Sequence, residues 1–136
     1  MYSVESYRTQ QRFNDQYKEI SEFLRITADH GFNEHFHWGR FYWMMAHPDL
    51  DIEALPKIAI FRDNNKGIVG IAIFDTCYQN RWYIIHSVSD EILLRQLMEY
   101  VNRYDDTPII KATCATLRFA SCSKILNTKV DIPRAF

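Results

Sequence analysis

The chain has 136 residues, of which 47% are hydrophobic, 24% charged and 15% aromatic, and its formal net charge is −1. This length and balance predict one domain over residues 1–136 with a sizeable core. Sixteen basic residues against 17 acidic ones exclude a nucleic-acid binder that relies on a strong positive field. The chain has only four glycines, Gly31, Gly39, Gly67 and Gly70, and they form neither a GxxxxGK[ST] loop nor a GxGxxG fingerprint.

Neither export nor metal binding is indicated. The first 11 residues lack the apolar core of a signal peptide, and no apolar stretch approaches the roughly 20 residues that cross a bilayer. Three cysteines without a CxxC pair argue against a disulfide scaffold and a cysteine zinc site. His35 and His37 lie two apart on a predicted helix and point in nearly opposite directions, so they cannot chelate one ion. We therefore expect a cytoplasmic protein with no metal, membrane or nucleic-acid partner.

The N-terminal part of the chain predicts one strand and two helices. Residues 7–13 are the candidate first strand. From Asn14, which can cap a helix, apolar residues recur at spacings of three and four towards Gly31, where a left-handed residue would end the helix. A second helix is predicted over 33–46, and its segment 36–45 is aromatic on nearly every side. It is either a core helix between two surfaces or one whose rings partly wall a ligand cleft.

Three strands are predicted next, as an antiparallel meander. The first two, at 57–61 and 68–74, flank the turn-forming segment 63–67. The third, at 81–86, follows a polar loop. The alternation of apolar runs and polar turns is typical of hairpin-connected strands.

One amphipathic helix and three shorter segments complete the chain. Ser87 and Ser89 are predicted to cap the helix. Its apolar face is formed by Leu93, Leu94, Leu97, Met98 and Val101. We then expect a strand over 108–116, a short helix over 117–126 and a last extended piece over 128–132. The order predicts an α/β chain of the α+β type, with a mixed, mostly antiparallel sheet flanked by helices.

Several phrases of the sequence resemble the GNAT superfamily of acyl-CoA N-acyltransferases. They are EFLR (22–25), FHWGR (36–40), WM (43–44), HPDL (47–50), LPKIAIF (55–61) and GIVGIA (67–72). Together they look like the N-terminal half of a bacterial two-domain GNAT protein, and the similarity covers about residues 10–105. It implies the GNAT fold and transfer of an acetyl group from acetyl-CoA to an amine acceptor.

The resemblance also assigns candidate site residues. In the family, the helix after the fourth strand begins beside the pyrophosphate of the cofactor, which places His86, Ser87, Val88 and Ser89 at the acetyl-CoA site. The fourth strand carries no carboxylate, so His86 is the remaining candidate for the general base. A capping role for the serines and a structural role for His86 are the alternatives.

The acceptor pocket is the second candidate site. Trp38, Arg40 and Trp43 are expected near the amine acceptor. Core packing explains the two tryptophans equally well.

The chain departs from the family pattern in two places. The loop that normally reads Arg/Gln-x-x-Gly-x-Gly/Ala is replaced by 85–91, which has no glycine and places Asp90 and Glu91 in the first helical turn. Two carboxylates there would repel a pyrophosphate. The closing hairpin of the family is short or missing, as in a domain truncated at its C-terminus, which would leave the fifth strand with an open edge. We expect that edge to pair with a second GNAT-like domain or a homodimer partner.

Two functions follow as expectations. One is an N-acetyltransferase whose acetyl-CoA loop is degenerate. The other is a non-catalytic GNAT-like scaffold or dimerisation module.

Overall fold

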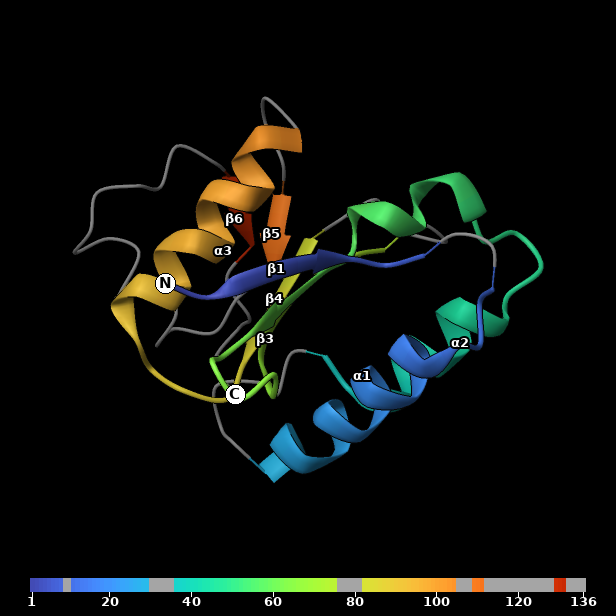
Figure 1. Ribbon diagram of the computed structural model, residues 1–136. Helices are drawn as coiled ribbons and strands as arrows, with labels where there is room; N and C mark the ends of the chain where they lie inside the picture. Colours follow the sequence, from blue (N-terminus) through green and yellow to red (C-terminus); the bar gives the residue numbers. More distant parts are fainter. Residues whose placement is uncertain (9–10, 30–35, 76–81, 105–108, 112–128, 132–136) are drawn as a thin grey trace.

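A single mixed sheet organises the chain (Figure 1). The computed structural model describes residues 1–8, 11–29, 36–75, 82–104, 109–111 and 129–131. Within these ranges the strands are β1 (Ser3–Ser6), β2 (Ala59–Arg62), β3 (Ile68–Phe74), β4 (Trp82–His86), β5 (Ile109–Lys111) and β6 (Lys129–Asp131), adjacent in that order. Strands β1 to β4 pair antiparallel, whereas β5 runs parallel to β4 and β6 parallel to β5. The predicted α+β class with a mixed, mostly antiparallel sheet is confirmed.

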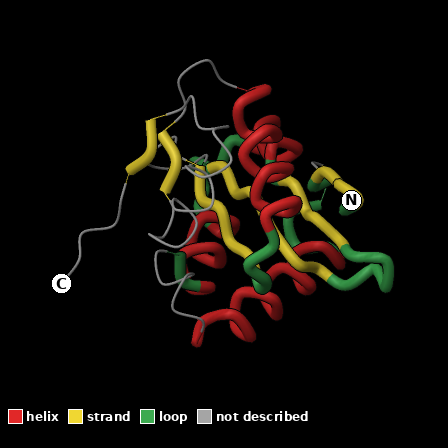
Figure 2. Tube along the Cα trace, turned by 90° about the vertical axis from the view of Figure 1, so that its left-hand side faces the viewer, coloured by secondary structure: helices red, strands yellow, loops and turns green. Residues whose placement is uncertain are grey.

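Helices cover both faces of the sheet. Helices α1 (Asp15–Ile26) and α2 (Trp38–Ala46) lie on one face and α3 (Glu91–Tyr104) on the other (Figure 1). Figure 2 shows β1 near the N-terminus at one side of the sheet and β5 and β6 at the opposite side. Two short 3-10 helices, η1 (Thr27–Asp29) and η3 (Ile52–Lys57), connect these elements. No helix in the described ranges is long and apolar enough to cross a membrane.

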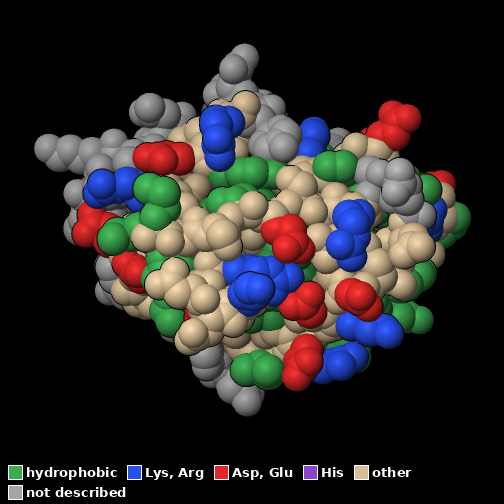
Figure 3. Space-filling model, viewed as in Figure 1, with side chains coloured by type: hydrophobic (Ala, Val, Ile, Leu, Met, Phe, Trp, Pro, Cys, Tyr) green, Lys and Arg blue, Asp and Glu red, His purple; other side chains and the backbone are tan. Residues whose placement is uncertain are grey.

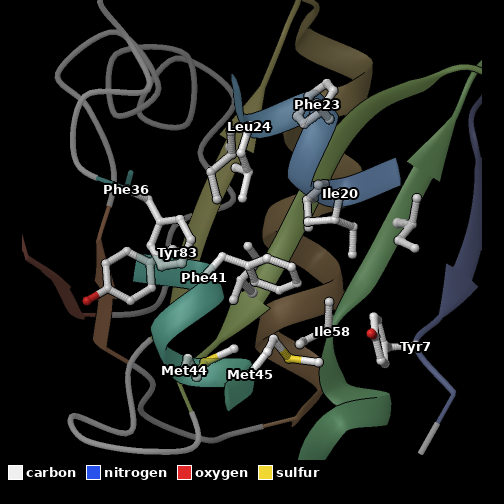
Figure 4. Close-up of a cluster of buried hydrophobic side chains, with 14 of the residues drawn as sticks. Tyr7, Ile20, Phe23, Leu24, Phe36, Phe41, Met44, Met45, Ile58 and Tyr83 are labelled. Carbon is white, nitrogen blue, oxygen red and sulfur yellow. The ribbon is translucent and has the colours of Figure 1, made fainter. Parts of the chain in front are cut away.

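The side chains of β3 and β4 alternate between two cores, because successive strand residues point to opposite faces. The core beneath α1 and α2 contains Ile71, Ile73, Tyr83 and Ile85, together with Phe36, Phe41, Met44 and Met45 (Figure 4). The core beneath α3 contains Ala72, Trp82 and Ile84 with the predicted apolar face of α3. The period-two pattern of the strands and the helical spacing of α3 therefore determine the layering.

Gly70 allows α3 to approach the sheet closely. A Cβ atom at this position would lie 3.3 Å from a methyl carbon of Leu93 and 3.3 Å from one of Leu97. Such contacts are tighter than nine in ten real Cβ contacts, so a larger residue requires these leucine side chains to shift by a few tenths of an ångström.

Two predicted boundaries near the N-terminus are wrong. The first strand, β1, begins at Ser3, four residues before the start of the predicted strand 7–13. Its mostly exposed residues form a strand because they pair with β2. Helix α2 begins at Trp38 rather than at residue 33, because the ring Nδ1 of His37 accepts the N–H of Gly39 and caps the helix. By contrast, Asn14 caps α1 as predicted, with its side chain accepting the N–H of Tyr17.

The described part of the fifth strand does not lie at the edge of the sheet. Strand β6 pairs with β5 at Ile109, Ile110 and Lys111. The expectation of an open edge at the fifth strand is therefore wrong over these residues. The rest of the predicted strand 108–116 and the predicted helix 117–126 lie outside the described residues.

Candidate functional site

His86 lies at the end of β4, where the candidate cofactor site was expected, and it is fully buried. It shares the α3 face of the sheet with Trp82 and Ile84, four and two residues before it. Its Nδ1 lies 2.8 Å from the carbonyl oxygen of Val88. Because a carbonyl can only accept, Nδ1 carries the proton in this contact, and the neutral ring then has Nε2 as its acceptor.

The chain after His86 is held by a bulge in β3. Phe61 pairs with Gly70 and Arg62 with Ile68, so Val69 is the extra residue between them. The carbonyl of Val69 accepts two hydrogen bonds from Ser87, one from its N–H at 2.9 Å and one from its side-chain hydroxyl at 3.4 Å. Ser87 therefore binds the sheet rather than capping α3.

Asp90 caps α3, so the prediction that Ser87 and Ser89 do so is wrong. Its side chain accepts the N–H of Ile92 at 3.0 Å, and its carbonyl accepts the first intrahelical bond, from Leu94, at 3.0 Å. The other oxygen of the carboxylate accepts a hydrogen bond from the hydroxyl of Tyr2. This bond, together with burial and the negative charge of Asp90, raises the pKa of Tyr2 above its ordinary value of 10.0.

The start of α3 is negatively charged. Beside it lies a cavity of about 340 Å³, whose lining includes the side chains of Tyr2, Asp63 and Asp90 and no lysine or arginine from the described residues. Glu91 stands in the first turn, where its carboxylate binds Arg95 at 2.9 Å. Helix-terminal charges of this kind contribute about 0.3–1 kcal/mol each, comparable to the attraction of the dipole for an anion.

These residues do not fit the pyrophosphate of acetyl-CoA. The N–H groups of Ser87 and Ile92 and the ring N–H of His86 already donate to oxygens of the chain itself. An anion would have to displace these bonds and also approach two carboxylates. The geometry at this helix end therefore disfavours an anion.

The expected acceptor residues lie on α2. The guanidinium of Arg40 binds the carboxylate of Asp75 and stands 5.2 Å from the ring centroid of Trp43. Trp43 is 42% exposed and its ring lies 4.7 Å from that of His47. Trp38 is partly buried, with the guanidinium of Arg25 4.9 Å from its ring centroid.

Asp75 is a charged residue that the sequence analysis missed. It directly follows β3, and its side chain is completely buried beside Arg40. A carboxylate immediately after a continuous apolar strand is the signal that could have identified it, since a buried charge needs a partner.

The structure separates the two candidate sites. Asp75 follows Phe74, which pairs with Trp82 at the start of β4, whereas His86 ends that strand. The four intervening steps along β4 correspond to about 13 Å. His86 also faces α3, on the side of the sheet opposite to α2 and Arg40. The described residues therefore form no single centre that contains both His86 and the α2 side chains.

Neither a metal cluster nor a known relative adds to this picture. The described residues contain no group of three or more histidine, cysteine, aspartate or glutamate side chains that could hold a metal ion. Comparison of the chain with models of protein families, with curated proteins and with solved structures found no match.

Proposed function

We propose that this chain is a GNAT-like domain that acts as a non-catalytic scaffold in an N-acetyltransferase assembly. The supporting topology is a set of four antiparallel strands followed by a parallel pair, with α3 crossing between β4 and β5. Two helices precede β2 and cover the other face. These features agree with the architecture that the sequence resemblance implies.

The observation that carries the non-catalytic role is the N-terminus of α3. The side chain of Asp90 accepts a hydrogen bond from the N–H of Ile92, and Glu91 adds a second negative charge in the first turn. A GNAT enzyme needs this helix end for the pyrophosphate of acetyl-CoA. In this chain the carboxylate of Asp90, rather than a ligand, accepts a hydrogen bond at this helix end.

Calorimetric titration with acetyl-CoA tests this function. We expect no saturable heat at millimolar acetyl-CoA for the wild-type chain. The double variant Asp90→Ser/Glu91→Gln serves as a comparison, because it keeps a capping hydroxyl and removes both charges. Saturable binding to the wild-type chain would overturn the non-catalytic proposal.

An active N-acetyltransferase is the second candidate, and one observation favours it. The bond from Nδ1 of His86 to Val88 selects the Nδ1–H tautomer of the neutral ring, which is the tautomer that a general base acting through Nε2 requires. In that case His86, Ser87, Val88 and Ser89 would contact acetyl-CoA, and an amine would be the acceptor.

The variant His86→Asn distinguishes the two candidates. An asparagine amide can still donate to the carbonyl of Val88 but has no group at the position of Nε2. We would measure release of coenzyme A thiol in the presence of small amines. Turnover by the wild-type chain that is lost in a folded His86→Asn variant would support the enzyme, and absence of turnover in both would support the scaffold.

A further inference from the structure

Strand β1 is an outer strand of the sheet, and its free edge is a potential docking surface. It pairs with β2 on one side only, and it lies in front of the other strands in Figure 1. A strand edge carries unpaired N–H and C=O groups that can pair with another chain. Whether these groups already have hydrogen-bond partners within the chain determines whether a further strand can pair with β1.

The ladder shows which groups of β1 face outward. The N–H of Tyr7 donates inward to the carbonyl of Ile58, in continuation of the β1–β2 pairing. Because the backbone groups of successive strand residues point to alternate sides, Ser3 and Glu5 also face β2. The outward-facing residues are therefore Tyr2, Val4, Ser6 and Arg8.

Gln96 of α3 pairs with the first of these residues. Its side-chain oxygen accepts the N–H of Tyr2 at 2.9 Å, and its side-chain NH₂ donates to the carbonyl of Tyr2 at 3.0 Å. An antiparallel neighbour would make the same two bonds, since a hydrogen-bonded residue pair exchanges one N–H···O bond in each direction. The amide of Gln96 thus takes the place of a neighbouring strand at this end of β1.

Gln16 of α1 takes the place of a neighbouring strand at the other end of β1. Its side-chain oxygen accepts the N–H of Arg8 at 2.9 Å, and its NH₂ group donates to the carbonyl of Ser6 at 3.0 Å. Gln16 is 2% exposed, and its NH₂ also donates to the carboxylate of Glu5 at 2.6 Å. These bonds fix the amide in place, so an incoming strand cannot displace it without leaving buried polar groups unsatisfied.

Charge adds to this closure. Figure 3, viewed from the same side as Figure 1, shows basic and acidic side chains gathered over this face. Arg62 of β2 binds Glu19 of α1 at 2.8 Å and lies 3.4 Å from Glu5 of β1. Charged side chains along an edge disfavour pairing with a second, identical edge.

We propose that Gln16 and Gln96 are edge-closing residues that keep a second copy of this chain from pairing with β1. Among the outward-facing residues, Tyr2 has both backbone groups bonded, Ser6 its carbonyl and Arg8 its N–H, whereas neither group of Val4 has a partner in the described part of the chain. A single residue pair is too short to hold a strand. This role is independent of the proposed scaffold function.

The test is the solution mass of Gln96→Leu. Leucine keeps the size of the side chain and removes both hydrogen bonds to Tyr2. We expect its mass at about 100 µM, measured by size-exclusion chromatography with light scattering, to rise at least twofold above wild type, with an unchanged circular dichroism spectrum. The matched control is Glu99→Leu, which adds the same apolar side chain at an exposed position of α3. A rise in both variants, or in neither, would overturn the proposal.

A rescue variant identifies the edge as the cause. The backbone groups of Val4 face outward, so Val4→Pro removes no bond to β2 but takes away the outward-facing N–H at the position of β1 where neither group is bonded. The double variant Gln96→Leu/Val4→Pro is expected to return to the wild-type mass, and persistent association would refute pairing through β1. If Gln96→Leu fails to fold, Gln96→Asn, which is one methylene too short to reach Tyr2, replaces it in the same comparisons.

Discussion

The ion pair between Arg40 and Asp75 determines whether Arg40 is available to a substrate. The two partners are buried very differently, with side-chain exposures of 30% for Arg40 and 0% for Asp75. Removing one partner therefore has unequal consequences. Arg40→Met leaves a carboxylate without its guanidinium in a site closed to water, whereas Asp75→Asn leaves a guanidinium that water can reach.

The expected magnitudes follow from this difference. Loss of one partner from a fully buried ion pair costs about 3–5 kcal/mol. Because water screens part of the Arg40 guanidinium, we expect Arg40→Met to lower the free energy of unfolding by about 2–4 kcal/mol. Asp75→Asn loses a charge-assisted hydrogen bond but keeps a polar group of the same shape, so we expect about 1–2 kcal/mol.

Urea unfolding followed by tryptophan fluorescence measures these effects. The double variant Arg40→Met/Asp75→Asn should be more stable than Arg40→Met alone, because it no longer buries a charge. Arg25→Met is the matched control. Its guanidinium also stands over a tryptophan, Trp38, and no carboxylate within 4.0 Å of it is found in the described residues. We expect its cost to stay below about 1 kcal/mol.

Two results would refute the reasoning. One is equal destabilisation by Arg40→Met and Arg25→Met, which would mean that the carboxylate of Asp75 does not need Arg40. The other is a double variant less stable than both single variants. In either case the inference that the buried carboxylate of Asp75 depends on Arg40 would be wrong.

Two further predictions concern stability. Gly70→Ala should lower the free energy of unfolding, measured in urea, by roughly 0.5–2 kcal/mol, because crowding against α3 exceeds the entropic gain from alanine. The control is Gly67→Ala, whose added Cβ would have its nearest contact at 3.5 Å, and it should be nearly neutral. The hydrogen bond from Gln16, and then the Arg62 guanidinium, hold the pKa of Glu5 below its ordinary value of 4.5. The stability this gives is present above that pH and is lost as the pH falls through the lower folded pKa. Wild-type stability should therefore fall more steeply below pH 4.5 than that of Glu5→Gln in acid-unfolding curves; parallel curves would contradict this.

The elements with strong local patterns could be predicted from the sequence. The five residues of the predicted apolar face of α3 are all buried, and the turn 63–67 joins two apolar strands. Both signals are contained in a short window of residues. Strand β1 has no such signal, because its exposed sequence Ser-Val-Glu-Ser becomes a strand only by pairing with β2, more than 50 residues later.

The candidate sites depend even more on non-local pairing. The sequence places His86 at the end of a strand and Arg40 on a helix, but it does not show which end of β4 lies near α2. That follows from the pairing of Phe74 with Trp82, which brings Asp75 to the start of β4. The position of Arg40 thus depends on a register that sequence spacing alone could not provide.

The cap of α3 connects the stability of the fold to its chemistry. A helix end can bind an anionic ligand only while its N–H groups are not satisfied by the chain itself. Asp90 satisfies the N–H of Ile92, which stabilises α3 by about 1 kcal/mol, and the same carboxylate repels any phosphate at that position. Creating an anion site here would therefore require replacing this carboxylate, and α3 would lose the stability that its cap provides. The carboxylate that caps this helix is therefore also the one that disfavours a pyrophosphate at its N-terminus.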